Sequence, residues 1–343
     1  EKLQMKYLDQ VLELIEQTAN NPPEARFTWM PEGLWAVESW LRTADTEKRE
    51  AFFAAVRAGL IGLDGLYGNA LTALYTDEEL FALIDYARRL RREHELPLDS
   101  AMISDVPGLT WGMVPALAQS GIRYLSDGPN PGHRIGLSRV WDDRPVWWVG
   151  PSGQDRILLW QSGLGYAHFH GRRISEAAIL EYLSRLEQQR FPYDIAQVRY
   201  NIGGDNGYPD TELPGFVMAW NERYAYPRLM LTTNSGMFHM LEDRYGDQLP
   251  AISGDFTPYW EDGAASTAAA TSAERAADEL LVQAGALYAM LAPKHYPRER
   301  VHEAWRQAVL YDEHTWGAHN SISEPDSPFA VQQDAYKQRF ATT

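Results

Sequence analysis

The sequence predicts an α/β fold in which a seven-stranded β/α barrel over residues 1–262 is followed by an α-helical bundle over residues 263–343. Three observations support this prediction. Short apolar runs alternate with helical segments between residues 101 and 232, as in a parallel sheet covered by helices. Polar residues or glycines follow the apolar runs, as at the mouth of such a barrel. The Ala-rich residues 262–273 end the alternation, and only helical periodicity follows them.

The first hundred residues are predicted to be mainly helical, because apolar side chains recur there at spacings of three and four residues. The expected helices cover residues 3–15, 34–41, 47–58 and 77–92. Pro22 and Pro23 end the first of them, since proline lacks the amide donor that a helix needs. Asp77 is expected to cap the last one.

The predicted sheet comes next. Strands are expected at residues 101–104, 122–125, 146–149, 156–160, 197–200 and 228–232, and helices at residues 115–120, 174–188 and 214–224. The strands on either side of residues 151–153, Pro-Ser-Gly, are expected to form a hairpin. Asp105, Asp205 and Asn234 follow predicted strands, so we expect the three side chains to lie together on one face of the barrel.

Composition limits the partners of the chain. Its 343 residues carry a formal net charge of −16, which disfavours nucleic acid, because a phosphate backbone is bound by clustered Lys and Arg. There are no cysteines, so disulfides and thiolate metal sites are excluded. No apolar run approaches the ~20 residues that span a bilayer, and the first residues do not resemble a signal peptide. We expect a soluble protein without a membrane partner; its compartment and oligomeric state stay open.

Three carboxylates occur in segments that suit chemistry. Asp105 lies in the sequence Ser-Asp-Val-Pro-Gly at a predicted strand end, and Asp205 lies among glycines that allow close approach of a ligand. Asp255 precedes Tyr259 and Trp260, a combination that suits stacking on a sugar ring with recognition of its hydroxyls. The 12 Trp and 18 Tyr of the chain also suit an aromatic sugar cleft. Each of the three carboxylates equally fits a turn or a helix cap.

Histidines are concentrated in two places. Residues 310–320 follow an amphipathic helix and include His314 and His319 beside carboxylates and an indole. Imidazole is the commonest metal ligand and proton carrier at neutral pH, although a histidine is also favoured at a helix C-terminus by the helix dipole. His168 and His170 alternate along an extended segment without an adjacent carboxylate, which makes a metal site there a weaker hypothesis.

Taken in order, these motifs resemble glycoside hydrolase family 38, the α-mannosidase-like enzymes, over nearly the whole chain. Residues 104–108 resemble the family's Asp-Pro-Phe-Gly block, and Gly204-Asp205 resembles the segment that carries its acid/base carboxylate. Residues 254–259 resemble its Gly-Asp-Phe-aromatic block, and Thr271-Ser272 resembles the Thr-Ser/Thr-Arg segment that comes after that block. Residues 313–317 resemble its metal-binding region in the helical domain. The match is closer to a divergent bacterial branch than to the well-known mannosidases.

The resemblance implies a β/α barrel, a three-helix bundle, a zinc ion that binds sugar hydroxyls and a retaining mechanism with two carboxylates about 5 Å apart. It gives Asp205 the acid/base role and His314 a metal-ligand role. The family's nucleophile position falls at Asn69 or Ala70, where no carboxylate stands, and Asp64 is the nearest one.

Asp105 completes the catalytic candidates. The predicted substrate contacts are Asn69, Trp111, Asp255, Tyr259 and Trp260. The family's first metal motif, His-x-Asp, has no match, so we expect an incomplete zinc site, and we expect the chain to lack the first barrel strand and the later β-domains. Hydrolysis of an α-linked sugar is the main hypothesis. A barrel that binds carbohydrate without cleaving it and a sugar lyase are the alternatives, because Asn69 replaces the nucleophile.

Overall fold

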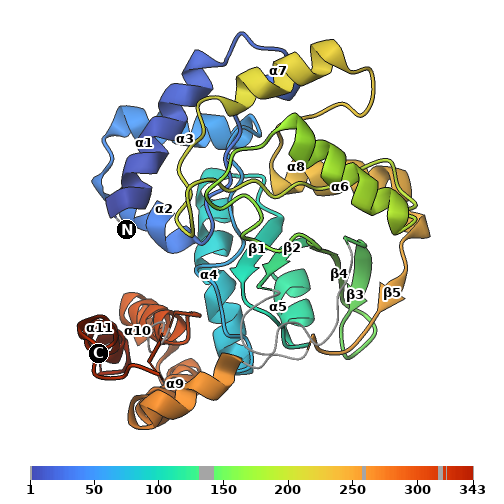
Figure 1. Ribbon diagram of the computed structural model, residues 1–343. Coiled ribbons are helices and arrows are strands. Elements are labelled where there is room, and N and C mark those ends of the chain that lie inside the picture. The colour runs from blue at the N-terminus through green and yellow to red at the C-terminus, as the bar shows by residue number, and fades with distance from the viewer. Residues whose placement is uncertain (1, 131–142, 257–259, 316–319, 322, 343) are drawn as a thin grey trace.

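The computed structural model of the protein describes residues 2–130, 143–256, 260–315, 320–321 and 323–342. A central sheet is covered by helices, and three further helices follow toward the C-terminus. Figure 1 shows these last three helices grouped beside the end of a long helix from the N-terminal half, apart from the sheet. The predicted mixed α/β class is confirmed, while the domain boundary at residue 262 stays a prediction.

The helices that periodicity predicts before residue 100 are confirmed. The described helices are α1 (Lys2–Gln17), α2 (Leu34–Thr43), α3 (Thr46–Arg57), α4 (Asp77–His94), α5 (Met113–Gln119), α6 (Glu176–Gln188), α7 (Leu213–Arg223), α8 (Asn234–Tyr245), α9 (Ala268–Leu291), α10 (Arg298–Tyr311) and α11 (Pro328–Thr342). Thr76 rather than Asp77 caps α4, because its hydroxyl accepts from the amide of Glu79 at 3.2 Å. None of the described helices is both long and apolar enough to cross a membrane.

The sheet explains why residues after two of its strands are neighbours. Its strands are β1 (Ser100–Asp105), β2 (Tyr124–Pro129), β3 (Val146–Val149), β4 (Arg156–Gln161) and β5 (Ala251–Ile252), in the order β1-β2-β4-β3-β5. β1, β2 and β4 are parallel, whereas β3 runs antiparallel to β4, which confirms the predicted hairpin. Asp105 is paired with Pro129 at the ends of β1 and β2, so the side chains that follow these strands share one edge.

The described part of the chain contains five strands, so the predicted closed barrel of seven strands is not confirmed. Residues 197–200 form no strand there, because the guanidinium of Arg199, rather than the backbone, donates to carbonyls of β1 and β2 at 3.1 and 2.9 Å. Residues 228–232 also form no strand. The side-chain nitrogen of Asn221 donates to the carbonyl of Leu229, and the side-chain oxygen accepts from the Leu229 amide, each at 2.9 Å. These two backbone groups are therefore not available to pair with another strand.

Part of the aromatic content serves packing. Trp148 and Trp160 are fully buried, and Trp160 lies with Tyr124 and Phe238 in a cluster between the sheet and α8. Tyr124 and Phe238 stack with ring centroids 5.2 Å apart. These side chains stabilise the attachment of α8 to the sheet, and the abundance of Trp and Tyr therefore reflects the core as well as any cleft.

Asp64 is a fully buried carboxylate that joins three segments. It accepts hydrogen bonds from the backbone amides of Gly33 at 2.9 Å, Leu66 at 3.0 Å and Met102 at 3.0 Å. Burial raises its pKa to about 7, and the three amides oppose that rise by stabilising the charge. Asp64 thus connects the loop before α2, the loop before α4 and strand β1.

We predict that Asp64→Asn lowers the free energy of unfolding by about 2–3 kcal/mol, because an amide nitrogen would replace one acceptor and face a backbone N–H. Urea unfolding followed by circular dichroism measures the change. Asp243→Asn, on the exposed face of α8, is the matched control and should change stability by no more than about 0.5 kcal/mol. Equal stability of the two variants would contradict this structural role for Asp64.

Candidate active site

A cavity of about 1840 Å³ collects candidate residues that lie far apart in the sequence. Five of the predicted site residues line it, namely Asn69, Asp105, Asp205, Trp260 and His314, and so does Asn234. The cavity opens at the carboxyl ends of β1 and β2, the edge where polar residues follow the strands. Asp105, Asp205 and Asn234 therefore border the same cavity, while their clustering on one face of a barrel stays a prediction.

Asp105 is the last residue of β1 and is held by two partners. Asn130, which follows β2, donates to its Oδ1 at 2.7 Å, and His314 lies 3.4 Å from its Oδ2. Burial disfavours the carboxylate, but the hydrogen bonds from His314 and Asn130 outweigh burial and hold the pKa of Asp105 below its ordinary value. Its backbone is left-handed, with a φ of 73°, a conformation that is uncommon for residues other than glycine.

His314 comes from the end of α10 and faces the sheet. Its amide donates to the carbonyl of Asn69 at 3.0 Å, and its Nδ1 lies 2.5 Å from a carboxylate oxygen of Glu313. Burial alone would lower the pKa of His314, whereas the charges of Glu313 and Asp105 raise it to about 10. The imidazole is therefore a cation placed between two carboxylates.

The buried ammonium of Lys337, on α11, fixes this segment. It donates to the backbone carbonyls of Leu310, Tyr311 and Glu313 at 2.9, 3.1 and 3.0 Å, and it lies 3.3 Å from the Glu313 carboxylate. These carbonyls belong to the end of a helix, where they lack helical donors. An antiparallel bridge between Ala70 and Glu313 then attaches the helix end to the loop before α4.

Asp205 lies across the cavity on a glycine loop. Gly203 and Gly204 have φ values of 97° and 133°, which only glycine adopts readily. The Asp205 side chain is 77% exposed, with His170 at 3.6 Å and the phenol of Tyr166 at 3.5 Å. Burial first, and then the charges of Asp105 and Asp205, raise the pKa of Tyr166. The two carboxylates thus flank one phenol.

Three residues at the site were missed from the sequence. Asn130 could have been found, because it directly follows a strand beside β1. Tyr166 and Arg199 carry no local signal, since their role depends on which distant segments they reach.

The two histidines at residues 168 and 170 lie in different surroundings. His170 lies 3.6 Å from Asp205, whereas the ring of His168 contacts Arg172 at 2.6 Å.

Other predicted residues lie elsewhere. Asp64 is buried beneath the cavity residues and does not line the cavity. Asp255 accepts from the amide of Trp111 at 2.6 Å, and the indole of Trp111 donates to the carbonyl of Val149 at 2.7 Å, so this pair joins two loops outside the cavity. Tyr259 lies outside the described residues.

The residues around His314 supply too few ligands for the zinc site that the resemblance implies. The described side chains offer one imidazole, the carboxylate of Asp105 and the amide of Asn69, whose oxygen accepts from the amide of Ser104 at 3.4 Å. Catalytic zinc usually has three ligands from His, Asp, Glu or Cys, and its imidazoles are neutral. Among the described residues, His314 and Asp105 have no third His, Cys, Asp or Glu ligand atom in a close group with them. These residues do not fit zinc as they stand, so we assign no catalytic step to a zinc ion.

Neither a protein-family model nor a curated protein matches the chain. Solved structures do match its fold. An α-mannosidase from Enterococcus faecalis V583 superposes with a TM-score of 0.72 at 16% identity, covering 99% of this chain and 38% of that one. A protein of glycosyl hydrolase family 38 from Enterococcus faecalis gives a TM-score of 0.63 at 15% identity, covering 99% and 37%.

A third structure, 4-α-glucanotransferase from Thermococcus litoralis, gives a TM-score of 0.51 at 14% identity, with 98% of this chain and 50% of that one covered. At such identities the likeness shows the fold alone. The chain has a glycoside hydrolase family 38-like fold, and it spans little more than a third of the length of the two Enterococcus structures.

We predict that Lys337→Met destabilises the protein by about 3–5 kcal/mol, because it leaves three carbonyls at the end of α10 without their donor and removes one of the two cations beside Glu313. The measurement is chemical unfolding, with hydrogen exchange at residues 310–315 as a local readout. Lys294→Met, at an exposed position, is the control. Unchanged exchange at the end of α10 would show that Lys337 does not hold it.

Proposed function

We propose that the protein is a glycoside hydrolase that cleaves an α-linked sugar, with Asp105 and Asp205 as its two carboxylates. The observation that carries this proposal is their position on either side of Tyr166 in one large cavity. The family 38-like fold supports the reaction class, and the resemblance of the Asp205 segment supports its role. An α-mannoside is the substrate class that the resemblance favours.

The cavity wall suits a carbohydrate. Trp29, Trp35, Trp260 and Tyr200 line it together with amide side chains such as Asn69. Aromatic faces bind the apolar faces of sugar rings, while amides and carboxylates recognise the hydroxyls. This combination of flat apolar surfaces and polar groups supports a sugar over a phosphorylated or strongly apolar ligand.

Asp205 serves as the acid and base in this proposal. Its exposed side chain can be reached by a sugar in the cavity and can therefore exchange a proton with the glycosidic oxygen. In the first step its proton passes to the glycosidic oxygen as the bond from that oxygen to the anomeric carbon breaks. In the second step it takes a proton from water, whose oxygen bonds to the anomeric carbon.

Asp105 serves as the nucleophile. His314 and Asn130 both hold it in one orientation, facing the cavity. Its oxygen forms a bond to the anomeric carbon as the leaving group departs, and that bond breaks when water attacks, so the configuration of the sugar is retained. Asp105 thereby takes the role that the family resemblance would place at Asn69. Asp64, bound by three backbone amides, has no catalytic role in this proposal.

Asp205→Asn should lower turnover of aryl α-glycosides with poor leaving groups by about 10²–10⁴-fold, the usual contribution of a general acid. Substrates with activated leaving groups should lose much less, because they depart without a proton. Steady-state kinetics on both classes tests this, with Asp247→Asn, exposed and outside the cavity, as control. An equal loss on both classes would assign Asp205 to binding instead.

Asp105→Asn should abolish turnover of both substrate classes, because the covalent step fails whatever the leaving group is. Azide, a small anion that can enter the vacated position, should restore turnover of activated substrates and give a glycosyl azide of inverted configuration, detected by proton NMR. Undiminished hydrolysis by the variant would remove Asp105 from the mechanism.

Asn69 favours a second candidate function, binding of carbohydrate without cleavage, because its amide stands where the resemblance expects a nucleophile. Calorimetry with α-linked oligosaccharides separates the two functions. Saturable binding by the unchanged protein, with no reducing sugar released on long incubation, would support the binding function and contradict hydrolysis.

A further inference from the structure

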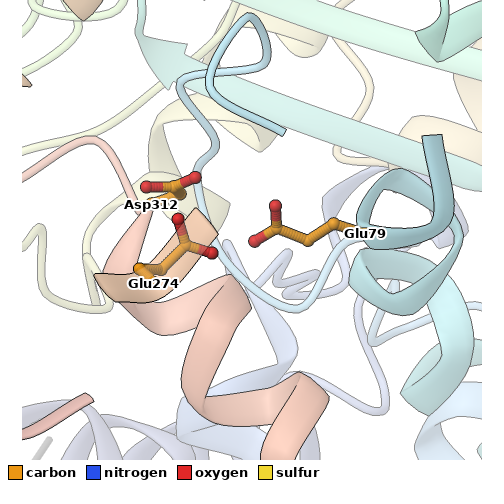
Figure 2. A group of neighbouring side chains, drawn as sticks. All are labelled: Glu79, Glu274 and Asp312. Atoms are coloured by element: carbon orange, nitrogen blue, oxygen red, sulfur yellow. The ribbon is translucent and has the colours of Figure 1, made fainter. Parts of the chain in front are cut away.

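Four carboxylates are buried together at the junction of α4 with the C-terminal helices. Glu79 comes from α4, Glu274 and Asp278 come from successive turns of α9, and Asp312 follows the last residue of α10; each is at most 2% exposed. One carboxylate oxygen from each of Glu79, Glu274 and Asp312 can be chosen so that the three atoms lie within 4.8 Å of one another. Figure 2 shows the carboxylate of Glu79 pointing from its helix toward those of Glu274 and Asp312.

When all four groups are ionised, none of the eight carboxylate oxygens of this cluster has a hydrogen-bond donor among the described residues. Burial raises the pKa of Glu79, Glu274 and Asp278, and these three carboxyl groups form hydrogen bonds with one another only when protons are present. Arg275 and Lys337 act on the cluster through their charge but form no described ion pair with it. The ammonium of Lys337 is occupied by Glu313 and backbone carbonyls. Buried carboxylates without donors are strongly unfavourable unless protons or a cation neutralise them.

We propose that Glu79, Glu274, Asp278 and Asp312 bind one calcium ion. Asp278 gives independent evidence for a ligand, because it lies outside the close triad and its two buried oxygens have no donor when the neighbouring carboxyl groups are ionised. A set of carboxylate oxygens without nitrogen or sulfur is typical of hard cations.

Calcium fits better than magnesium because of the number of oxygens. The triad oxygens lie within 4.8 Å of one another, close enough to share one ion that binds oxygen at about 2.3–2.6 Å. Four carboxylates, some of them bidentate, can also supply the six to eight oxygens that calcium prefers, whereas magnesium keeps several waters that this enclosed site would have to admit.

The site would fasten the segment that carries His314. Asp312 directly precedes Glu313, and its carbonyl accepts from the amide of Leu71 at 3.3 Å. A cation shared with α4 and α9 would hold this segment in addition to Lys337. The role is structural, and it does not depend on the proposed hydrolase activity.

The test uses the full chain after treatment with a chelator and dialysis. Calcium chloride should bind with a stoichiometry of one in calorimetry and should raise the melting temperature by about 3 °C or more at saturation. Glu274→Gln and Asp278→Asn should each weaken binding at least tenfold. Glu279→Gln, an exposed carboxylate on the same helix, should leave binding unchanged.

The variants remain informative without calcium. Removing one buried carboxylate relieves repulsion in the empty cluster, so chelated Glu274→Gln should melt no lower than chelated wild-type protein. Absence of calcium binding and of a melting shift at neutral pH would overturn the proposal and show that shared protons neutralise the cluster. Calcium binding that Glu274→Gln does not weaken would place the ion elsewhere and would equally overturn it.

Discussion

The candidate site depends on the attachment of the end of α10 to the loop at residues 69–71. The chain supplies Asp105 from the sheet and His314 from a helix more than two hundred residues later, so the two meet only if this helix end is fixed. Lys337 fixes it from α11 by satisfying three carbonyls and Glu313. The ammonium fixes the helix end, and backbone bonds from His314 to Asn69 and from Leu71 to Asp312 then join it to the loop.

Buried carboxylates are neutralised in different ways in this acidic chain. Backbone amides surround Asp64, neutral and cationic side chains hold Asp105, and Lys337 together with His314 pairs with Glu313. The cluster around Glu274, by contrast, has no donor among the described residues when its carboxyl groups are ionised. The contrast identifies that cluster as exceptional within this fold, because the same chain supplies partners to Asp64, Asp105 and Glu313.

Local patterns predicted the helices and the β3–β4 hairpin, because periodicity and turn residues act over a few positions. They also located Asp105 and Asp205, which follow or interrupt extended segments. They could not predict the pairing of the sheet: Arg199 and Asn221 occupy backbone groups with side chains, and nothing in their neighbours signals this. Asp64 was a catalytic candidate because it is the carboxylate nearest to Asn69 in the sequence, and its amide partners on three separate segments could not be predicted.

The two proposed catalytic carboxylates differ in how firmly they are held, and their proposed roles require this difference. Asp105 ends a paired strand and has partners on the adjacent strand end and on α10, so its oxygens keep one position, as a nucleophile aimed at a single carbon must. Asp205 follows two glycines in an exposed loop and can adjust as the proton moves to the leaving oxygen and back from water. Tyr166 lies between them and limits that adjustment, because its phenol interacts with both carboxylates.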